Sequence, residues 1–480
     1  MKNEFFKLFK KTSIRIMFLV MLAIVLLLNC VTKFAGNNYN GIYYYYEDIN
    51  YLKQEISKYN PEIPTQAGDY VFFATEIEVV ELITKYSENS WKINIIQNFA
   101  YPIISDVNHA KFIEKDEISY QANLKILNDF KQKLENNDWQ YFANQEKIQA
   151  EENVKNIENE LKATTSDTRE KELKKSYEQA LLILDVAKMR IDRNIDYSNS
   201  YLSNALYEYQ HALSYLIEYD GNTNLTYDEK LLIQQQQESA ALAKYIIDNH
   251  QDIYQNNTFR SGIMTLVDNY SWIIIVMIII VAGSIVAEEF SKGTIKLLLI
   301  KPYTRRKILR AKFITSLLMI LITFITITVF QFIIGFLLFG LDSLSIPAVI
   351  YNFSTNSIET LNVFGYLLIK IIGYLPQAIL LLTLSFGLSA IFTNTALATA
   401  LPIMGIITGG IINQLVTYYN VTWMKYFVTL NWDTFSMFFG RLSAFEPISL
   451  ISSLITCLIY FIIMIIPTFI IFKKKNIKNI

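Results

Sequence analysis

Six long apolar runs constrain this sequence more than any other feature. Each run reaches the length of about 18 residues that a helix needs to cross a bilayer core about 30 Å thick. A segment in lipid must satisfy its own backbone hydrogen bonds, so a single apolar run crosses as a helix. The runs are Ile14–Val31, Leu266–Ala287, Phe313–Leu341, a stretch within Leu361–Phe392, Ala396–Tyr418 and Leu450–Phe472. We therefore predict an all-α polytopic membrane protein with six transmembrane helices.

The rest of the chain is polar enough to form a domain in water. Hydrophobic residues make up 52% of the sequence and charged residues 18%, but the charged ones are concentrated between the first two apolar runs. We predict an N-terminal interfacial helix and first membrane helix in 1–32, an inserted domain in 33–262 and a five-helix membrane core in 263–480. For the first residues, a simple positive flank of the membrane helix is the alternative to an interfacial helix.

Basic residues are distributed unevenly, and this predicts the orientation. The formal net charge is −1, yet both termini and the segment from Lys292 to Lys312 are strongly basic. Short basic loops stay on the cytoplasmic side of a membrane. We therefore expect both termini in the cytoplasm and the acidic inserted domain outside the cell. The abundance of Asn, Ile, Lys and Tyr favours a bacterial source, and hence a bacterial plasma membrane.

We expect the inserted, extracytoplasmic domain to be mainly helical and coiled-coil-like. Apolar residues recur at spacings of four and three from Leu173 to Ile191, and the pattern resumes after a four-residue slip at Ile195. Such a repeat is typical of a coiled-coil seam with a stutter. A preceding helix over 119–163 would pair with it as a long antiparallel hairpin. The fold of 33–107 stays open, and the domain is either a rigid stalk or a platform for a substrate or partner.

A charged segment, 288–312, separates the second and third membrane helices. Its notable residues are Glu288, Glu289, Phe290, Gly293, Thr294, Leu297, Leu298, Pro302, Arg305 and Arg306. This order predicts a membrane helix that ends in acids, a short amphipathic helix across its foot, and a basic arm that returns to the membrane. A solvated loop with nothing bound to it is the alternative.

The order of these residues resembles the intracellular loop of ABC-2-type permeases, the membrane subunits of ATP-binding-cassette (ABC) transporters. The resemblance covers the first membrane helix and the chain from Leu266 onward, and it leaves the inserted domain uncovered. It implies an ABC-2, type V exporter-like fold. It also implies that two such six-helix units pair in the lipid bilayer, either as two copies of this chain or with a paralogue, in a homodimer or heterodimer.

In ABC-2 permeases this loop is a coupling helix that docks on a separate ATPase subunit, which holds ATP and Mg²⁺. The resemblance implies that Glu288 and Glu289 face the ATPase, that Gly293 and Thr294 fix the turn, and that Arg305–Arg306 hold lipid phosphate or ATPase acids. The implied function is export of a peptide, antimicrobial, ion or lipid-like substrate. The alternative is an ATPase-independent scaffold or receptor of a secretion system, since some related proteins carry a coiled-coil insert after their first helix.

Polar residues within the apolar runs are candidates for lining a transport pathway. They are Gln331, Lys370, Gln377, Asn413 and Gln414. Intramembrane polar groups mark pathways or bond neighbouring helices together, and both interpretations stay open. Residues 419–447 are aromatic-rich but too polar to span, so we expect an external re-entrant segment or, alternatively, an aromatic belt loop.

Sequences that carry catalytic chemistry are missing. No G-x-x-x-x-G-K-[ST] loop occurs, so ATP hydrolysis is expected in a partner chain and no cofactor in this one. The three histidines form no metal-binding spacing, and no nucleic-acid-binding signature is present. We expect a transporter subunit rather than an enzyme.

Overall fold

The chain folds into two compact units. The computed structural model describes residues 2–34, 41–87, 90–295, 303–419, 421–443 and 448–475. The membrane unit contains residues 1–36, 226–234 and 253–480, and the inserted unit contains residues 37–225 and 235–252. Helix α11 (Tyr227–Asn249) contributes residues to both units.

Six helices in the described part of the membrane unit are long and apolar enough to cross a bilayer, which confirms the six predicted spans. They are α2 (Thr12–Phe34), α13 (Leu266–Ser291), α15 (Arg305–Phe339), α16 (Val363–Phe392), α17 (Thr395–Tyr419) and α18 (Leu450–Lys474). Helix α15 begins at Arg305 rather than at Phe313, because the Thr304 side chain caps it by accepting a hydrogen bond from the Lys307 N–H. The basic arm and the third membrane helix are therefore one continuous helix.

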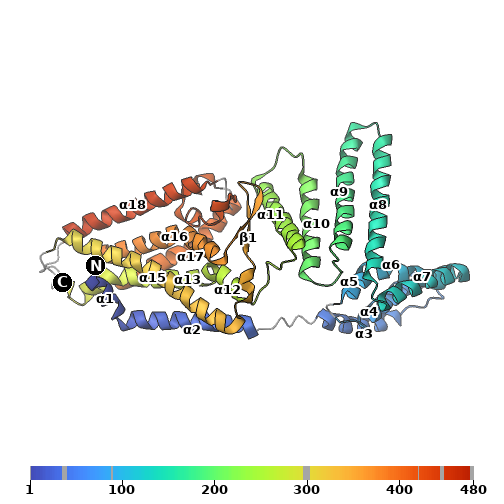
Figure 1. Ribbon diagram of the computed structural model, residues 1–480, viewed down its shortest axis with the longest axis horizontal. Helices are drawn as coiled ribbons and strands as arrows, with labels where there is room; N and C mark the ends of the chain where they lie inside the picture. The colour runs from blue at the N-terminus through green and yellow to red at the C-terminus, as the bar shows by residue number, and fades with distance from the viewer. Residues whose placement is uncertain are drawn as a thin grey trace. The chain divides into compact units, whose positions relative to one another are not determined.

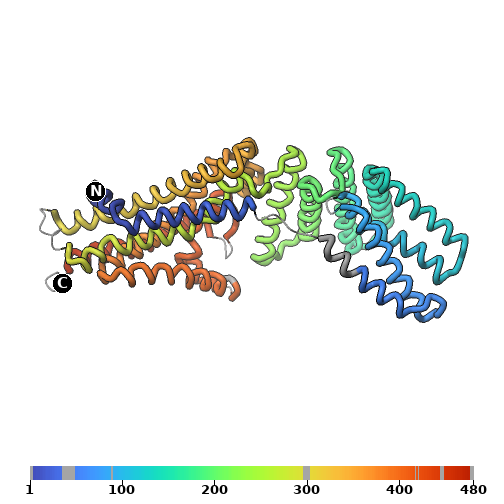
Figure 2. The backbone as a smooth tube through the Cα atoms, turned by 90° about the horizontal axis from the view of Figure 1, so that it is seen from below, coloured from blue at the N-terminus to red at the C-terminus, as the bar shows by residue number. Residues whose placement is uncertain are grey.

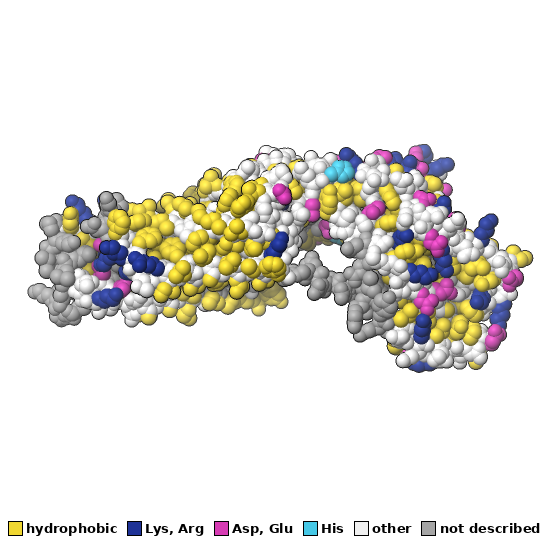
Figure 3. Space-filling view, turned by 60° about the horizontal axis from the view of Figure 1, so that its bottom comes forward, with side chains coloured by type: hydrophobic (Ala, Val, Ile, Leu, Met, Phe, Trp, Pro, Cys, Tyr) yellow, Lys and Arg dark blue, Asp and Glu magenta, His cyan; other side chains and the backbone are white. Residues whose placement is uncertain are grey.

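Helix α13 forms the core of the membrane unit (Figures 1 and 2). It packs against α2, α15, α16 and α17, and 72% of its most apolar window is buried, against 11% for α18. Ser385 Oγ on α16 lies 2.8 Å from Ile279 O on α13 and 2.7 Å from Ala398 O on α17, which holds these three helices together. Apolar side chains cover the flank of the unit, where lipid would surround it (Figure 3).

The aromatic segment 421–443 is a set of three short 3₁₀ turns. These are η4 (Thr422–Tyr426), η5 (Val428–Leu430) and η6 (Ser436–Phe439). Thr434 donates to the Gly373 carbonyl of α16 from both its backbone N–H and its hydroxyl, at 3.3 and 3.0 Å. Gly373 permits this contact, since a Cβ there would lie 2.7 Å from Phe435 Cα. The segment is therefore anchored on α16.

A small β-hairpin, which was not predicted, connects α15 to α16 after the 3₁₀ turn η3 (Asp342–Ser345). Strand β1 (Ala348–Asn352) pairs antiparallel with β2 (Ser357–Leu361), so that Ala348 faces Leu361. The Phe353 N–H donates to Phe439 O at 2.8 Å and joins the hairpin to η6. Within the described residues, the fold is otherwise helical.

The inserted unit is helical wherever the structure describes it. Its elements before α11 are α3 (Gly41–Ile56), α4 (Pro64–Ile83), α5 (Trp91–Ile95), η1 (Ile96–Ala100), α6 (Tyr101–His109), η2 (Ala110–Glu114), α7 (Glu117–Glu135), α8 (Trp139–Ala163), α9 (Asp167–Asp192) and α10 (Tyr201–Tyr219). The elements η1 and η2 are π-helical turns. The described residues of the stretch whose fold stayed open, 33–107, are thus α-helical or π-helical apart from turns.

The two long helices predicted for this unit are each divided in two. Asn194, between α9 and α10, has φ +54°, and Asn137, between α7 and α8, has φ +57°; a helix excludes this left-handed conformation. Ser200 then caps α10 by accepting from the Ser203 N–H at 3.2 Å. The four-residue slip in the apolar pattern is a turn rather than a stutter. The antiparallel hairpin is the shorter pair α8–α9 (Figure 1).

A half-buried carboxyl fixes this turn to α8. The Tyr197 hydroxyl donates to Glu146 Oε2 at 2.5 Å, and the Arg190 guanidinium lies over the Tyr197 ring at 4.0 Å. Burial raises the pKa of Glu146, although the Tyr197 hydrogen bond and the nearby Arg190 oppose the shift. The folded unit therefore holds the Glu146 proton more tightly than the unfolded chain does.

We expect the inserted unit to lose stability as pH rises from the ordinary carboxyl pKa of 4.5 through the raised pKa of Glu146, because unfolding releases a proton in this window. Glu146→Gln keeps a hydrogen-bond acceptor for Tyr197 but has no titrating group. This variant should therefore flatten the dependence of stability on pH. Hydrogen-exchange protection of α8 and α9 in the full-length protein, corrected for intrinsic rates, measures this. The exposed Glu151→Gln on α8 is the matched control. An equal slope in wild type and Glu146→Gln would contradict the assignment.

Candidate functional site

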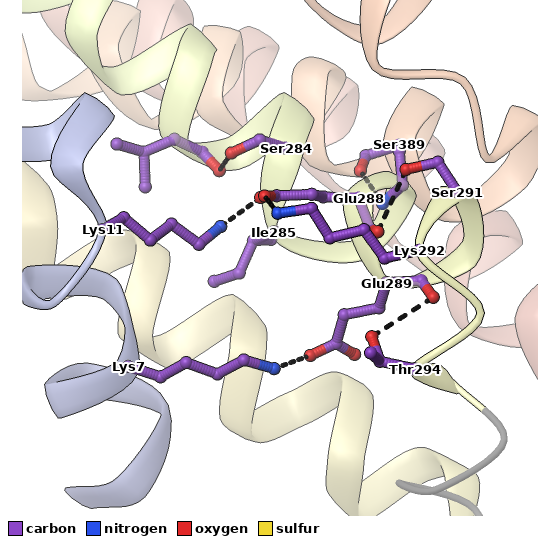
Figure 4. Close-up of polar contacts among 12 residues, drawn as sticks. Lys7, Lys11, Ser284, Ile285, Glu288, Glu289, Ser291, Lys292, Thr294 and Ser389 are labelled. Carbon is purple, nitrogen blue, oxygen red and sulfur yellow. Dashed lines mark hydrogen bonds and ion pairs between the residues drawn. The ribbon is translucent and has the colours of Figure 1, made fainter.

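Charged side chains gather where the apolar run of α13 ends, at the basic end of the membrane unit (Figure 3). They come from the N-terminal helix α1 (Lys2–Phe9), the turn after it, the last turns of α13 and the first turns of α15. The members of this foot cluster are Glu4, Lys7, Lys11, Glu288, Glu289, Lys292 and Lys312. Figure 4 shows how α1 and α13 present their charged side chains to each other.

Lys312 is the buried centre of the foot cluster, with 1% of its surface exposed. Its ammonium lies 2.9 Å from Glu289 Oε1, 3.1 Å from Glu4 Oε2 and 3.1 Å from the Ile285 carbonyl. A lysine ammonium has three N–H donors, so three acceptors saturate it. Lys312 thereby joins α15 to α13 and to α1.

Two further lysines attach the N-terminal segment to the end of α13. Lys7 donates to Glu289 Oε1 at 2.5 Å, and Lys11 donates to Glu288 Oε2 (Figure 4). Partial burial opposes the charge of Lys7, but its hydrogen bond and ion pair with Glu289 outweigh burial and raise its pKa. Lys292 donates to the other oxygen of Glu288 at 2.6 Å. Both glutamates are thus engaged by lysines of this chain.

A pocket of about 220 Å³ lies between α1 and α13 within the foot cluster. Its lining combines the cluster's charged side chains with Leu8, Ile285 and Thr294. Glu289, which is 5% exposed, contributes to the wall. Its Oε2 atom is buried and has no hydrogen-bond partner among the described residues. The pocket wall therefore includes a carboxylate with one buried oxygen that has no hydrogen-bond partner among the described residues.

The predicted turn follows the two glutamates. Gly293 has φ +69°, a conformation that glycine adopts without steric cost, and Thr294 Oγ1 donates to Glu289 O at 3.4 Å. Phe290 is buried, with its ring 6.4 Å from the Phe472 ring of α18. Leu297, Leu298 and Pro302 lie outside the described residues.

The two arginines at the start of α15 have different environments. Arg305 donates to the backbone carbonyls of Lys473 and Lys475 at 3.4 and 2.7 Å, so it binds the end of α18. Arg306 is exposed, as are Lys307 and Arg310, and none of the three forms an ion pair with another described residue. The exposed basic surface at this end therefore begins at Arg306 rather than at Arg305.

Both glutamates, which the family resemblance directs toward a partner protein, are paired within this chain. Glu289 is buried between Lys7 and Lys312, and Glu288 lies between Lys11 and Lys292. A carboxylate at the end of a membrane helix needs counter-charges, and α1 and α15 provide them here. Removing either acid would disturb the foot itself before it disturbed any partner.

The five intramembrane polar residues do not form one site. Gln331 and Asn29 exchange two amide hydrogen bonds at 2.9 and 3.0 Å. Lys370 pairs with Asp268, and Asn413 bonds both polar groups of Thr429. These three residues bond neighbouring segments together, as in interhelical packing. Gln377 is half-buried and Gln414 is exposed on α17, and the pathway interpretation stays a prediction for all five residues.

Four residues of the foot cluster were not among the predicted site residues: Glu4, Lys7, Lys11 and Lys312. A signal was present, because Glu4, Lys7, Leu8 and Lys11 follow the helical spacing of i, i+3, i+4 and i+7. Lys312 shares a helix face with Leu309 and Ser316, which are buried. A lysine on a buried helix face requires an acid near it, and Glu289 is that acid.

The side chains of the cluster are suited to charge pairing and to binding a polar ligand. It contains lysines and carboxylates but no nucleophile paired with a base. No group of His, Cys, Asp or Glu side chains within the described ranges is placed to hold a metal ion. The chemistry present is charge pairing, hydrogen bonding and a pocket open to a polar ligand.

Replacing Lys312 alone with Met should destabilise the membrane unit by about 3–5 kcal/mol, because Glu289 is left buried without its main counter-charge. Replacing both Lys312 and Glu289 with Met should recover most of the loss. Denaturant unfolding in detergent measures both variants, and Lys307→Met, at an exposed neighbour, is the control. A double variant no more stable than Lys312→Met would contradict the buried ion pair.

Two proteins of Bacillus subtilis (strain 168) are similar to this chain. The "Uncharacterized protein YhcI" of Bacillus subtilis (strain 168) is 30% identical over 201 residues, which are 42% of this chain and 64% of that relative. The match thus spans less than two thirds of YhcI. The "Uncharacterized membrane protein YdbK" of the same organism is 25% identical over 202 residues, 42% of this chain and 76% of the relative. No solved structure is significantly similar to this chain.

The relatives and the fold agree on the class of protein. YdbK is described as a membrane protein, and six apolar helices of this chain are long enough to span a bilayer, so the chain is a multi-pass membrane protein. The profile of one family matches residues 227–478, which is more than half of the chain and includes α13 and the foot of α15. The chain therefore belongs to the family described as "Protein of unknown function (DUF2705)".

Proposed function

We propose that this chain is the membrane subunit of an ABC-2-type transporter that is driven by a separate ATPase. The observation that carries the proposal is the foot of α13. There an apolar helix ends at Glu288 and Glu289, turns at Gly293 and returns as α15 from Arg305, with the segment from Lys7 to Lys11 bound across it. A helix end held against a fixed support is what a soluble motor subunit needs in order to move a membrane helix.

The position of α13 supports this role. It is the most buried of the six spans and packs against four of the others. A displacement of its foot would therefore reach the core of the membrane unit rather than its lipid-facing surface. Lys312 ties α15 to the same point, so both helices that carry the loop would move together. In this mechanism ATP binding to the partner biases a two-state arrangement of the membrane helices.

The foot cluster holds the end of α13 against the start of α15 in this mechanism. The partner contacts the exposed surface beside the cluster. Arg306 and Arg310 are suitable contacts, because both are exposed, lie four residues apart on one helix face and have no ion pair with another described residue. A surface with free positive charge favours an acidic partner and rapid association.

The remaining features of the transporter follow the positive-inside rule and the family resemblance. The basic foot would face the cytoplasm with both termini, and the inserted unit would lie outside the plasma membrane of a bacterial cell. A second copy or a paralogue would complete the transporter, and ATP and Mg²⁺ would bind to the ATPase. The substrate class would be a peptide, antimicrobial, ion or lipid-like molecule, exported from the cell.

An affinity purification of the full chain from native membranes in mild detergent tests the proposal, with mass spectrometry of the bound proteins. We expect a P-loop ATPase in about equal amount. Reversing both Arg306 and Arg310 to Glu should lower its recovery about tenfold, which corresponds to a loss of about 1.4 kcal/mol. Lys474→Glu, an exposed charge reversal at the end of α18, should leave recovery unchanged.

Two results would contradict the proposal. Recovery of secretion or cell-wall components without an ATPase would favour the alternative, a membrane scaffold or receptor. Equal ATPase recovery with the double charge reversal and with wild type would remove the basic surface of α15 from the docking site.

A further inference from the structure

The pocket of the foot cluster offers both an acceptor for a cation and donors for an anion. We propose that it binds the phosphoethanolamine headgroup of a membrane lipid, with the ammonium at Glu289 and the phosphate between Lys7 and Lys292. This site is independent of any ATPase, since the residues involved all belong to this chain.

The ammonium end of the ligand is specified by Glu289. Its Oε1 atom already accepts from Lys7 and Lys312 at 2.5 and 2.9 Å, whereas its buried Oε2 atom has no partner in the described chain. An unsatisfied buried carboxylate oxygen is costly, and a charged N–H donor satisfies it best. A primary ammonium that reached this oxygen from the pocket would supply that donor.

The phosphate end is specified by two lysines that keep free donors. The Lys7 side chain is 51% exposed and the Lys292 side chain 66% exposed. Each donates one side-chain hydrogen bond to a glutamate in the described structure, and a lysine ammonium has three N–H groups. Both can therefore bond a phosphate at the pocket mouth without releasing Glu288 or Glu289.

The height of the pocket along α13 favours a lipid as the source of the headgroup. Glu288 and Glu289 directly follow the apolar run that ends at Ala287, and the ends of a spanning helix lie at the level of the lipid headgroups. Leu8 and Ile285 line the pocket on the apolar side. Phe6 of α1 is 54% exposed, as expected for a helix at the lipid interface.

The need for a charged N–H donor at Glu289 distinguishes the ethanolamine headgroup from the choline and glycerol headgroups. A choline group carries the same positive charge but has no N–H, so it cannot donate to Glu289. A glycerol group can donate through a hydroxyl but brings no positive charge to the carboxylate. The pocket should therefore prefer phosphatidylethanolamine to phosphatidylcholine and to phosphatidylglycerol.

The test titrates delipidated full-length protein in detergent with short-chain phosphatidylethanolamine, phosphatidylcholine and phosphatidylglycerol, and with free phosphoethanolamine. Native mass spectrometry and calorimetry report binding. We expect phosphatidylethanolamine to bind about tenfold more tightly than phosphatidylcholine, the effect of one charge-assisted hydrogen bond. Weaker binding of free phosphoethanolamine would assign the site to a lipid, and equal binding would assign the same headgroup chemistry to a soluble source.

Two variants locate the binding. Glu289→Gln should remove the preference for ethanolamine over choline. Glu151→Gln, at an exposed acid of α8 outside the pocket, is the control and should keep the preference. Lys292→Ala should weaken every phosphate-bearing ligand to a similar extent, and we expect this variant to fold because the Lys292 side chain is 66% exposed.

Three outcomes would overturn the proposal. Equal binding of the ethanolamine and choline lipids to wild type would show that the buried oxygen selects no donor. Tighter binding of phosphatidylglycerol would indicate a general anion site. An ethanolamine preference that persists in a folded Glu289→Gln variant would place the headgroup elsewhere, and the comparison of lipids on wild type decides the question even where that variant does not fold.

Discussion

The membrane unit depends on the burial of one ammonium group, that of Lys312. A buried charge is tolerated only when its partners and hydrogen bonds compensate for the loss of water. Here the compensation comes from α13 through Glu289 and the Ile285 carbonyl, and from α1 through Glu4. The places where α1, α13 and α15 meet are therefore set by a single charge. An apolar contact at the same point would fix them less specifically, because apolar contacts are not directional.

The membrane spans could be predicted because lipid leaves an apolar run few alternatives to a helix. Other parts lacked such a constraint. In the inserted unit, the same spacing of apolar residues suits a long helix and two helices joined by a turn. Only the polar run Asp196–Ser200, where Ser198 bonds Asp196 and Ser200 caps α10, distinguishes them. The β-hairpin between α15 and α16 depends on pairing and on contact with η6, which local sequence does not encode.

The candidate site was predictable in place but not in detail. The order of acids, glycine and arginines located the segment between α13 and α15. It did not indicate that Glu289 is buried, because that depends on α1, which is distant in sequence. Arg305 illustrates the same limit. Its guanidinium binds backbone carbonyls at the end of α18, and carbonyls are present at every residue, so no sequence pattern marks them as partners.

The charge balance of the foot cluster connects its structural and its functional roles. Glu288 has a lysine at each oxygen, and Lys312 has an acceptor for each N–H. These saturated ion pairs give the foot a fixed geometry and leave no free hydrogen-bonding group for a ligand. Glu289 has lysine partners at Oε1 and no described hydrogen-bond partner at Oε2. Lys7 and Lys292 keep free N–H donors beside it. A ligand that binds these open groups would add hydrogen bonds between α1 and α13 without breaking the existing ones. Occupancy of the pocket would therefore stiffen the same joint through which a motor subunit would act.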